Sequence, residues 1–284
     1  MVPLTMTATG EILSERAGVV NIGLEGILLL SAFGAVVGAE AGGPLAGLVV
    51  GLGVGAILGL IHGVIAVYFR GDQIISGVGI NILALGLVAI GIVWQWGVAG
   101  FHQVDRALRI PHLVTPLGSM SPMVIVTVLL AALTYYLIHH TNLGLQIQAV
   151  GENPAAADAA GVRVERVRLF GAVYAGALAG LAGAYLSIDW LATITRNLPA
   201  GRGFIALATV VFSRLNPFLA VVGGLIFGFF DGLGLLASTS REITQVVPYQ
   251  FIQMLPYVVT LLVVTGVIGR ARFPAASGQP YRRE

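Results

Sequence analysis

The amino-acid sequence predicts an all-α protein that crosses a membrane several times. Hydrophobic residues make up 57% of its 284 residues and charged residues only 10%, whereas about 25% of the residues in a soluble domain are charged. The mean hydropathy is +0.91, and the 39 glycines suit helices that pack closely in lipid. We therefore expect a single transmembrane domain over residues 1–284, with no soluble domain and no cleavable signal peptide.

Apolar runs predict eight to nine transmembrane or half-spanning helices. Two runs, 2–13 and 203–212, are too short to cross the roughly 30 Å hydrocarbon core. We expect both inside the protein, where their free backbone groups can find partners. The long runs are 22–39, 44–69, 74–98, 122–138, 167–188, 217–236 and 249–268.

Small residues recur at every fourth position on three of the predicted helices. Such stripes let two helices approach to backbone contact, so they predict tight packing within the chain, with a dimer face as the alternative. The stripes are Gly47, Gly51, Gly55, Gly59 and Gly63; Ala172, Gly176, Gly180 and Ala184; and Gly224, Gly228 and Gly232.

The distribution of arginine predicts the orientation of the chain. If the loop over about 150–164 is cytoplasmic, 10 of the 15 arginines lie inside and 5 outside, which agrees with the excess of positive charge on cytoplasmic loops. The C-terminal tail over about 270–284 is then also cytoplasmic, and its prolines and glycine predict loose order. The protein would reside in a bacterial or archaeal cytoplasmic membrane.

Two residue types are missing, and this limits the chemistry of the chain. Without cysteine it has no disulfide and no cysteine-ligated metal. The chain also has no lysine, because all 15 residues counted as Lys or Arg are arginine. The Gly-Lys-Ser/Thr phosphate loop of many ATPases therefore cannot form. We expect no catalytic residue, no metal site and no cofactor here, and any ATP that drives the protein would be bound by a partner subunit.

A short polar stretch between two long apolar runs predicts a very small helix with defined ends. Asn153 is a suitable N-cap residue, Pro154 suits the first helical position, and Gly161 can end the helix in the left-handed conformation. A helix over 154–160 is too short to be stable alone in water. We therefore expect another protein surface to dock against it.

The first polar cluster lies between two apolar runs near the N-terminus. Charges at membrane depth usually face a bundle interior or an aqueous path. Glu15 and Arg16 predict a tight cytoplasmic break, with Asn21 and Glu25 one turn apart on the next helix and facing a pathway or gate. The alternative is that Arg16 pairs with Glu15 or Glu11 only to fix the turn.

A second polar cluster comprises Asp72, Ser76 and Asn81. Ser76 and Asn81 enter an apolar helix, where they can hydrogen-bond a hydroxylated solute or join neighbouring helices; the residues alone leave both open. Asp231 is a lone carboxylate in an apolar run and requires a partner or a cavity. We favour a structural role for Asp231 over a proton relay.

Several of these stretches resemble one family of membrane proteins. Residues 14–26 (SERAGVVNIGLEG) resemble the N-terminal signature of permease subunits of ATP-binding-cassette nucleoside importers, within the ribose and branched-chain amino acid permease family. Residues 151–162 (GENPAAADAAGV) resemble the cytoplasmic coupling segment of that family, and residues 200–208 and 255–257 resemble its C-terminal half. At 214–217 the chain reads RLNP, where sugar permeases of that family more often carry a Gly-rich loop, so the resemblance favours nucleosides over simple sugars.

The resemblance implies a fold similar to the cobalamin-importer permease and a path between two permease subunits. The implied partners are a cytoplasmic ATPase, a second and different permease subunit, and an extracytoplasmic substrate-binding lipoprotein. It assigns ATPase coupling to Glu152, Asn153, Pro154, Ala157, Asp158, Gly161 and Arg163. Arg163, Arg166 and Arg168 would pair with acidic groups of the ATPase.

Three alternative functions remain. A permease for simple sugars of the ribose or galactose type would belong to the same family. An ion-coupled secondary transporter would need a coupling-ion site, for which Asp231, Glu11 and Glu25 are the candidates. An integral-membrane enzyme would need a cluster of His, Asp and Glu at one membrane face, and the sequence shows none.

Overall fold

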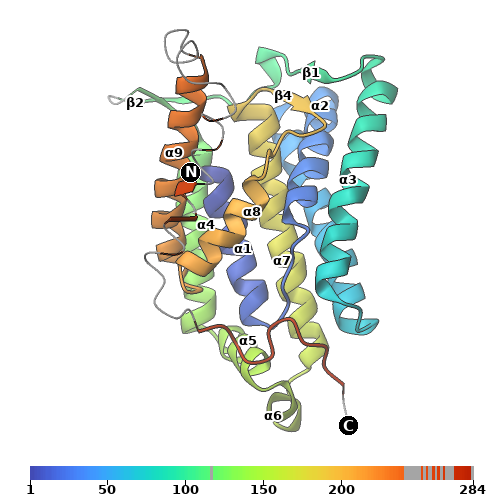
Figure 1. Ribbon diagram of the computed structural model, residues 1–284, viewed down its shortest axis with the longest axis vertical. Helices are drawn as coiled ribbons and strands as arrows, with labels where there is room; N and C mark the ends of the chain where they lie inside the picture. The colour runs from blue at the N-terminus through green and yellow to red at the C-terminus, as the bar shows by residue number, and fades with distance from the viewer. Residues whose placement is uncertain are drawn as a thin grey trace.

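The computed structural model describes residues 1–115, 118–239 and 272–282, together with isolated positions between 251 and 265. In these residues the protein is a bundle of α-helices with short strands at one end and two short helices at the other (Figure 1). The predicted segment 249–268 falls mostly outside the described residues, and so does the motif at 255–257.

Five described helices are long and apolar enough to cross a membrane, which agrees with the predicted all-α polytopic fold. They are Leu24–Tyr68, Gln73–Trp96, Pro122–His140, Val164–Trp190 and Pro217–Ser238. Figure 1 labels the α-helices among them α2 (Leu24–Gly63), α3 (Gln73–Trp96), α4 (Pro122–His140), α7 (Val164–Tyr185) and α9 (Pro217–Thr239). The π-helix η1 (Val64–Tyr68) continues α2, and the π-helix η3 (Leu186–Trp190) continues α7.

Helix α2 contains two of the predicted segments, and they fold back on each other. Gly42 and Gly43 have non-helical backbone angles, with φ of +82° at Gly43, and Pro44 follows at a position where its missing N–H costs nothing. A Cβ placed on Gly38 would lie 2.9 Å from the Cβ of Val50, although these residues would be about 18 Å apart in a straight helix. The predicted break between 39 and 44 is therefore confirmed.

The first of the two short predicted helices lies inside the bundle, as expected, whereas the second is only half-buried, with Phe204 49% exposed. All residues of α1 (Val2–Arg16) except Arg16 are buried. Helix α1 is in contact with α4, α7, α8 (Arg202–Phe212) and α9, and Figure 1 shows it at the centre of the bundle, beginning near mid-height. An element that short can end at membrane depth only because other helices surround its free backbone groups.

The small-residue stripes of α2 and α7 pack against each other within the chain. A Cβ on Gly55 would lie 2.2 Å from the carbonyl oxygen of Gly176, and one on Gly59 would lie 2.5 Å from that of Ala172. At Gly55 and Gly59 only glycine allows this approach, because even a methyl group would collide with the facing backbone. The third stripe packs likewise where Gly224 meets Thr5. Close intramolecular packing, the preferred interpretation, is confirmed for these stripes.

The two ends of the bundle differ in structure. At the strand end, β1 (Phe101–Gln103) pairs antiparallel with β4 (Thr193–Thr195), and β2 (Leu113–Thr115) pairs with β3 (Gly118–Met120). The short 3₁₀ helix η2 (Arg106–Leu108) lies between β1 and β2. At the opposite end, the α6 end, lie α5 (Asn142–Glu152) and α6 (Pro154–Ala159).

Most described arginines lie at the end to which the sequence assigned them. Arg70, Arg163 and Arg166 line one hollow at the α6 end, and Arg16 reaches the turn after α8 at the same end. Arg202 differs, because the predicted orientation counts it among the five external arginines. It is instead the first residue of α8, only 9% exposed, and its charge is neutralised inside the bundle.

Candidate functional site

Helix α6 has the two ends that the sequence predicts. The Asn153 side-chain oxygen accepts a hydrogen bond from the backbone N–H of Ala156 at 3.0 Å. Pro154 occupies the first helical position, and Gly161 follows in the left-handed conformation with φ of +86°. The helix itself runs over Pro154–Ala159, one residue shorter than expected.

The faces of α6 differ in exposure. Ala157 is 4% exposed and packs into a core cluster with Val164 and Val167. We expected Ala157 on the docking surface, and this expectation is wrong, because the residue faces the protein. The outer face consists of the exposed alanines Ala155, Ala156, Ala159 and Ala160.

The other predicted coupling residues surround this outer face. Glu152 and Arg163 are exposed on either side of α6, and Arg163 is the N-cap residue of α7. Asp158 is half-buried, and one of its oxygens accepts a hydrogen bond from the Tyr281 hydroxyl at 3.1 Å. Arg168 is 2% exposed, so the predicted pairing of Arg168 with a partner's acidic groups is wrong.

The first polar cluster forms a non-helical break between α1 and α2, over residues 17–23. Side chains from three helices bind its backbone groups. The N–H of Val20 donates to Gln73 Oε1 at 2.7 Å, and the carbonyl oxygen of Val20 lies 3.1 Å from His62 Nε2. The N–H of Asn21 donates to Glu11 Oε1 at 2.7 Å. These bonds satisfy irregular backbone inside the bundle, where water is scarce.

Asn21 itself is placed differently from the prediction. It was expected on the same helix as Glu25, one turn away, but α2 begins only at Leu24. Asn21 lies in the break, fully buried, and its Oδ1 accepts a hydrogen bond from the N–H of Gly23 at 2.9 Å. The two side chains therefore do not share a helix face.

Arg16 does not pair with an acidic residue in the described structure. Its Nε and Nη2 donate to the carbonyl oxygen of Leu215, at 3.0 and 2.8 Å, so pairing with Glu15 or Glu11 is not how the turn is fixed. Leu215 has a positive φ of 60° and lies in the connection between α8 and α9. Arg16 thus ties the end of α1 to that connection.

The second polar cluster supports the break and the start of α3. Asp72 is an exposed N-cap residue of α3, whose Oδ1 accepts from the N–H groups of Ile74 and Ile75 at 2.8 and 3.0 Å. Ser76 Oγ lies 3.0 Å from His62 Nδ1. Ser76 could either bind a solute or join neighbouring helices, and in the structure it joins α3 to α2 through His62.

Asn81 joins α3 to the region where the break meets α2. Its Nδ2 donates to the carbonyl oxygen of Ile22 at 3.1 Å, and its Oδ1 accepts from the N–H of Gly26 at 2.7 Å. A buried polar group costs free energy unless it is bonded in this way. In this conformation, Asn81 is committed to the protein backbone.

Glu25 caps a helix that is distant in the sequence. Its Oε1 accepts from the N–H of Gly201 at 2.6 Å, and its Oε2 accepts from the N–H of Gly203 at 2.7 Å. These free N–H groups at the start of α8 favour a negative charge. Sequence reasoning missed this contact, although the GRG sequence at 201–203, which directly precedes the apolar run, was a signal of a helix start.

Buried hydrogen-bonding capacity without a partner is concentrated on α1 and the break. Among the described residues, buried side-chain atoms without a partner include one oxygen of each glutamate of α1 and the Nδ2 of Asn21. The atoms in this stretch are Thr5 Oγ1, Thr7 Oγ1, Thr9 Oγ1, Glu11 Oε2, Glu15 Oε2 and Asn21 Nδ2. They can bind a hydroxylated solute only if the surrounding helices separate, because each of these residues is at most 5% exposed.

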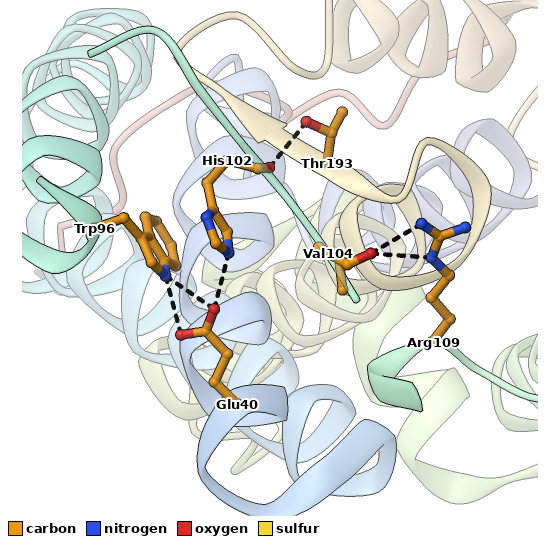
Figure 2. Close-up of polar contacts among 6 residues, drawn as sticks. All are labelled: Glu40, Trp96, His102, Val104, Arg109 and Thr193. Carbon is orange, nitrogen blue, oxygen red and sulfur yellow. Dashed lines mark hydrogen bonds and ion pairs between the residues drawn. The ribbon is translucent and has the colours of Figure 1, made fainter. Parts of the chain in front are cut away.

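The strand end carries two histidine–carboxylate pairs that the sequence did not reveal. Glu40 accepts from His102 Nε2 at 2.9 Å and from Trp96 Nε1 at 2.8 Å, and the two rings stack 4.2 Å apart (Figure 2). Asp189 lies 2.6 Å from His112 Nε2 and accepts from the Ser121 hydroxyl.

These pairs do not form a catalytic set. The Asp189 carboxylate lies between His112 and Ser121, so the hydroxyl bonds the carboxylate and no serine–histidine pair forms. No group of three or more His, Cys, Asp or Glu side chains suited to a metal ion is found in the part of the chain that the structure describes. The pairs instead attach the connection between α3 and α4 to α2 and η3.

Comparisons with known proteins match nearly the whole chain. A family model described as the branched-chain amino acid transport system permease component matches residues 1–264. The guanosine ABC transporter permease protein of Bacillus subtilis is 37% identical over 98% of this chain and 92% of its own length. The nucleoside ABC transporter permease protein of Lactococcus lactis is 33% identical over 98% of this chain and 93% of its own length.

Two sugar permeases are also similar. A putative glucose ABC transporter permease protein of Haloferax volcanii is 34% identical over 99% of this chain and 94% of its own length. The ribose import permease protein of Escherichia coli is 33% identical, but over only 44% of this chain and 41% of its own length. No solved structure matches, so the expected likeness to the cobalamin-importer permease stays a prediction.

Proposed function

Because this chain belongs to the family of branched-chain amino acid transport system permease components, we propose that it is the transmembrane subunit of an ATP-driven nucleoside importer. The observation that carries the proposal is the match to guanosine and nucleoside permeases over 98% of the chain. The break, α1 and α6 all fall within the matched residues 1–264. The chain supplies the path, and the chemical energy comes from ATP bound by another subunit.

Helix α6 is the element that the ATPase contacts and moves. Its exposed alanine face offers a smooth surface that can fit closely into a socket, because packing of small side chains needs no specific polar partner. Exposed Arg163 and Arg166 flank it and favour acidic groups around the socket. Since α6 packs through Ala157 against Val164 of α7, a push on α6 reaches the long helix directly.

The path runs beside α1 and opens at the break. The partnerless atoms of Thr5, Thr9 and Glu11 supply donors and acceptors suited to the hydroxyl groups and ring nitrogens of a nucleoside. Arg16, bonded to the Leu215 carbonyl, closes the α6 end. We name this closure, formed by Arg16 together with Glu15 and Asn21, the gate. The side chains of Asp72, Ser76, Asn81 and Glu25 keep the surrounding helices in place.

The partners follow from this assignment. An importer of this family works with an ATPase and a substrate-binding protein. We infer further that the ATPase docks at the α6 end on the cytoplasmic side, that a lipoprotein delivers substrate at the strand end, and that a second, different permease completes the path. The chain has no catalytic role and holds no cofactor of its own.

A glucose-type sugar is the second candidate substrate. The Haloferax volcanii relative, 34% identical over 99% of this chain, favours it. Both substrates carry hydroxyl groups that the α1 side chains can bind, and a nucleoside differs from glucose in its base and in its five-membered ribose ring.

Competition for uptake tests the substrate. The permeases, ATPase and binding protein are reconstituted in liposomes with internal ATP, and radiolabelled guanosine uptake is measured. Excess adenosine or unlabelled guanosine should abolish uptake, while ribose and glucose should leave it unchanged. Labelled glucose uptake that nucleosides fail to inhibit would overturn the nucleoside assignment. Uptake that follows a proton or sodium gradient without ATP would overturn the importer itself.

A further inference from the structure

The C-terminal tail crosses the α6 end of the bundle in an ordered path. We expected it to be loosely ordered, and for residues 272–282 this is wrong. Residues 275–278 form a turn, and the tail runs past α5 and the start of α7 at this end of the bundle (Figure 1). We name residues 272–282 the strap.

Two backbone hydrogen bonds attach the strap to segments far away in the sequence. The N–H of Ala276 donates to the carbonyl oxygen of Gly151 at 2.9 Å, and the N–H of Gly278 donates to that of Gly18 at 3.2 Å. Gly151 belongs to the last turn of α5, directly before α6, and Gly18 belongs to the break after α1. The strap therefore bridges the segment that carries α6 and the gate.

Arg168 of α7 fixes the strap at a third point. Its side chain is 2% exposed, and its Nη1 donates to the carbonyl oxygen of Gln279 at 2.8 Å. Its Nη2 lies 3.5 Å from the carbonyl oxygen of Ala276. A buried guanidinium is costly unless its N–H groups are bonded. Among the described residues, strap carbonyls are its hydrogen-bond acceptors, so α7 and the strap depend on each other.

The strap also contacts α6 itself. The Tyr281 hydroxyl donates to Asp158 Oδ2 at 3.1 Å, and the Tyr281 ring packs against the core cluster that contains Ala157 and Val164. Between the strap and the start of α6 lies a hollow of about 260 Å³, lined by Glu152, Asn153 and Pro154 on one side and by Ala275 and Pro280 on the other. The strap thus lies beside the surface on which the ATPase is proposed to dock.

We propose that the strap is a positioning element of the coupling machinery, which holds α6 at a fixed place relative to the break and α7. This inference rests on the proposed role of α6. When the ATPase pushes on α6, the Tyr281–Asp158 bond and the bonds of Arg168 carry the displacement to Gly18 at the gate. Tyr281 and Arg168 are positioning residues, because they act through α6 and the break and not on the substrate.

Loosening and re-tightening the Tyr281–Asp158 contact tests the proposal. The chain has no cysteine, so the pair Asp158→Cys/Tyr281→Cys places two thiols for a short bis-maleimide linker. In the reconstituted importer, the pair should lower guanosine imported per ATP hydrolysed by about five-fold, the factor that one hydrogen bond of ordinary strength supplies. Linking the thiols should restore the ratio, which a role in folding alone would not predict.

The controls separate this proposal from the proposed function. Asp158→Cys alone, treated with the same linker, should stay uncoupled. Tyr281→Phe, which keeps the ring, should show the same loss as the cysteine pair before linking. Suppose that Tyr281→Phe and the unlinked pair keep wild-type coupling while Ala156→Arg on the outer face of α6 is uncoupled. This result would overturn the proposed role of the strap but not that of α6. Wild-type coupling in Ala156→Arg as well would overturn the role of α6.

Discussion

Arg202 at the start of α8 and Asp231 of α9 form an ion pair with two hydrogen bonds inside the bundle. Nε donates to Oδ2 at 3.0 Å and Nη2 donates to Oδ1 at 3.1 Å, with the two side chains 10% and 13% exposed. The guanidinium carbon also lies 4.8 Å from the centre of the Trp190 ring. Asp231 therefore has the partner that a carboxylate in an apolar run requires. This pairing agrees with the structural role that the sequence analysis favours over a proton relay.

Asp231→Asn tests whether the pair is structural. It leaves the Arg202 charge without its counter-ion, so the purified protein should lose on the order of 3 kcal/mol of stability, because breaking a buried pair costs more than removing both charges. The double variant Arg202→Gln/Asp231→Asn should recover part of the loss. The exposed Asp105→Asn is the control, and thermal unfolding in detergent is the measurement. A normally stable Asp231→Asn whose uptake no longer responds to an ion gradient would instead support a secondary transporter.

The α2–α7 contact predicts opposite effects for two neighbouring glycines. A Cβ on Gly55 would lie 2.2 Å from a carbonyl oxygen of α7, whereas one on Gly53 meets nothing within 4 Å. Gly55→Ala should therefore destabilise the protein by about 1–3 kcal/mol or more, by overpacking. Gly53→Ala should be neutral or stabilise it by up to about 1 kcal/mol, through helix propensity.

Thermal unfolding and size-exclusion chromatography of both glycine variants provide the check. If Gly55→Ala were as stable as Gly53→Ala and altered only the association of two chains, the stripe would be a dimer face.

Asn81→Leu separates a structural from a substrate-binding role for this residue. The leucine leaves the Ile22 carbonyl and the Gly26 N–H without partners, and each unsatisfied group costs about 1–3 kcal/mol. Stability should fall, whereas the KM for guanosine should be unchanged in the protein that remains folded. The exposed Asn142→Leu should stay within about 0.5 kcal/mol of wild type. A raised KM at unchanged stability would show that Asn81 contacts the substrate.

Much of the fold follows from local pattern. The apolar runs, the glycine stripes, the break near Gly43 and the capped helix α6 each depend on residues within a few positions of each other. Each has a physical cause that a short stretch of sequence reveals. These causes are the length of the apolar run, side-chain volume and cap geometry. The predicted long helices and α6 therefore agree with the structure where the chain is described, whereas α5 and the short strands were not predicted.

The candidate site depended on partners far apart in the sequence. Glu25 binds the start of α8, Arg16 binds the carbonyl of Leu215, and Arg168 binds the strap. Each of these polar side chains binds backbone groups, which carry no residue-specific pattern. The sequence showed that buried charges needed partners, but only the packing of α1 at the centre determined which ones.

Helix α6 is proposed to transmit the work of the ATPase through its exposed alanine face. Ala156→Arg adds a long charged side chain to that face and should leave unfolding temperature and membrane insertion unchanged. Ala107→Arg, exposed in η2 at the strand end, is the matched control. The decisive measurement is guanosine imported per ATP hydrolysed by the reconstituted importer. We predict that Ala156→Arg lowers this ratio by about ten-fold or more, as the loss of about 1.4 kcal/mol of coupling would, while Ala107→Arg keeps it. A wild-type ratio in Ala156→Arg would contradict the claim.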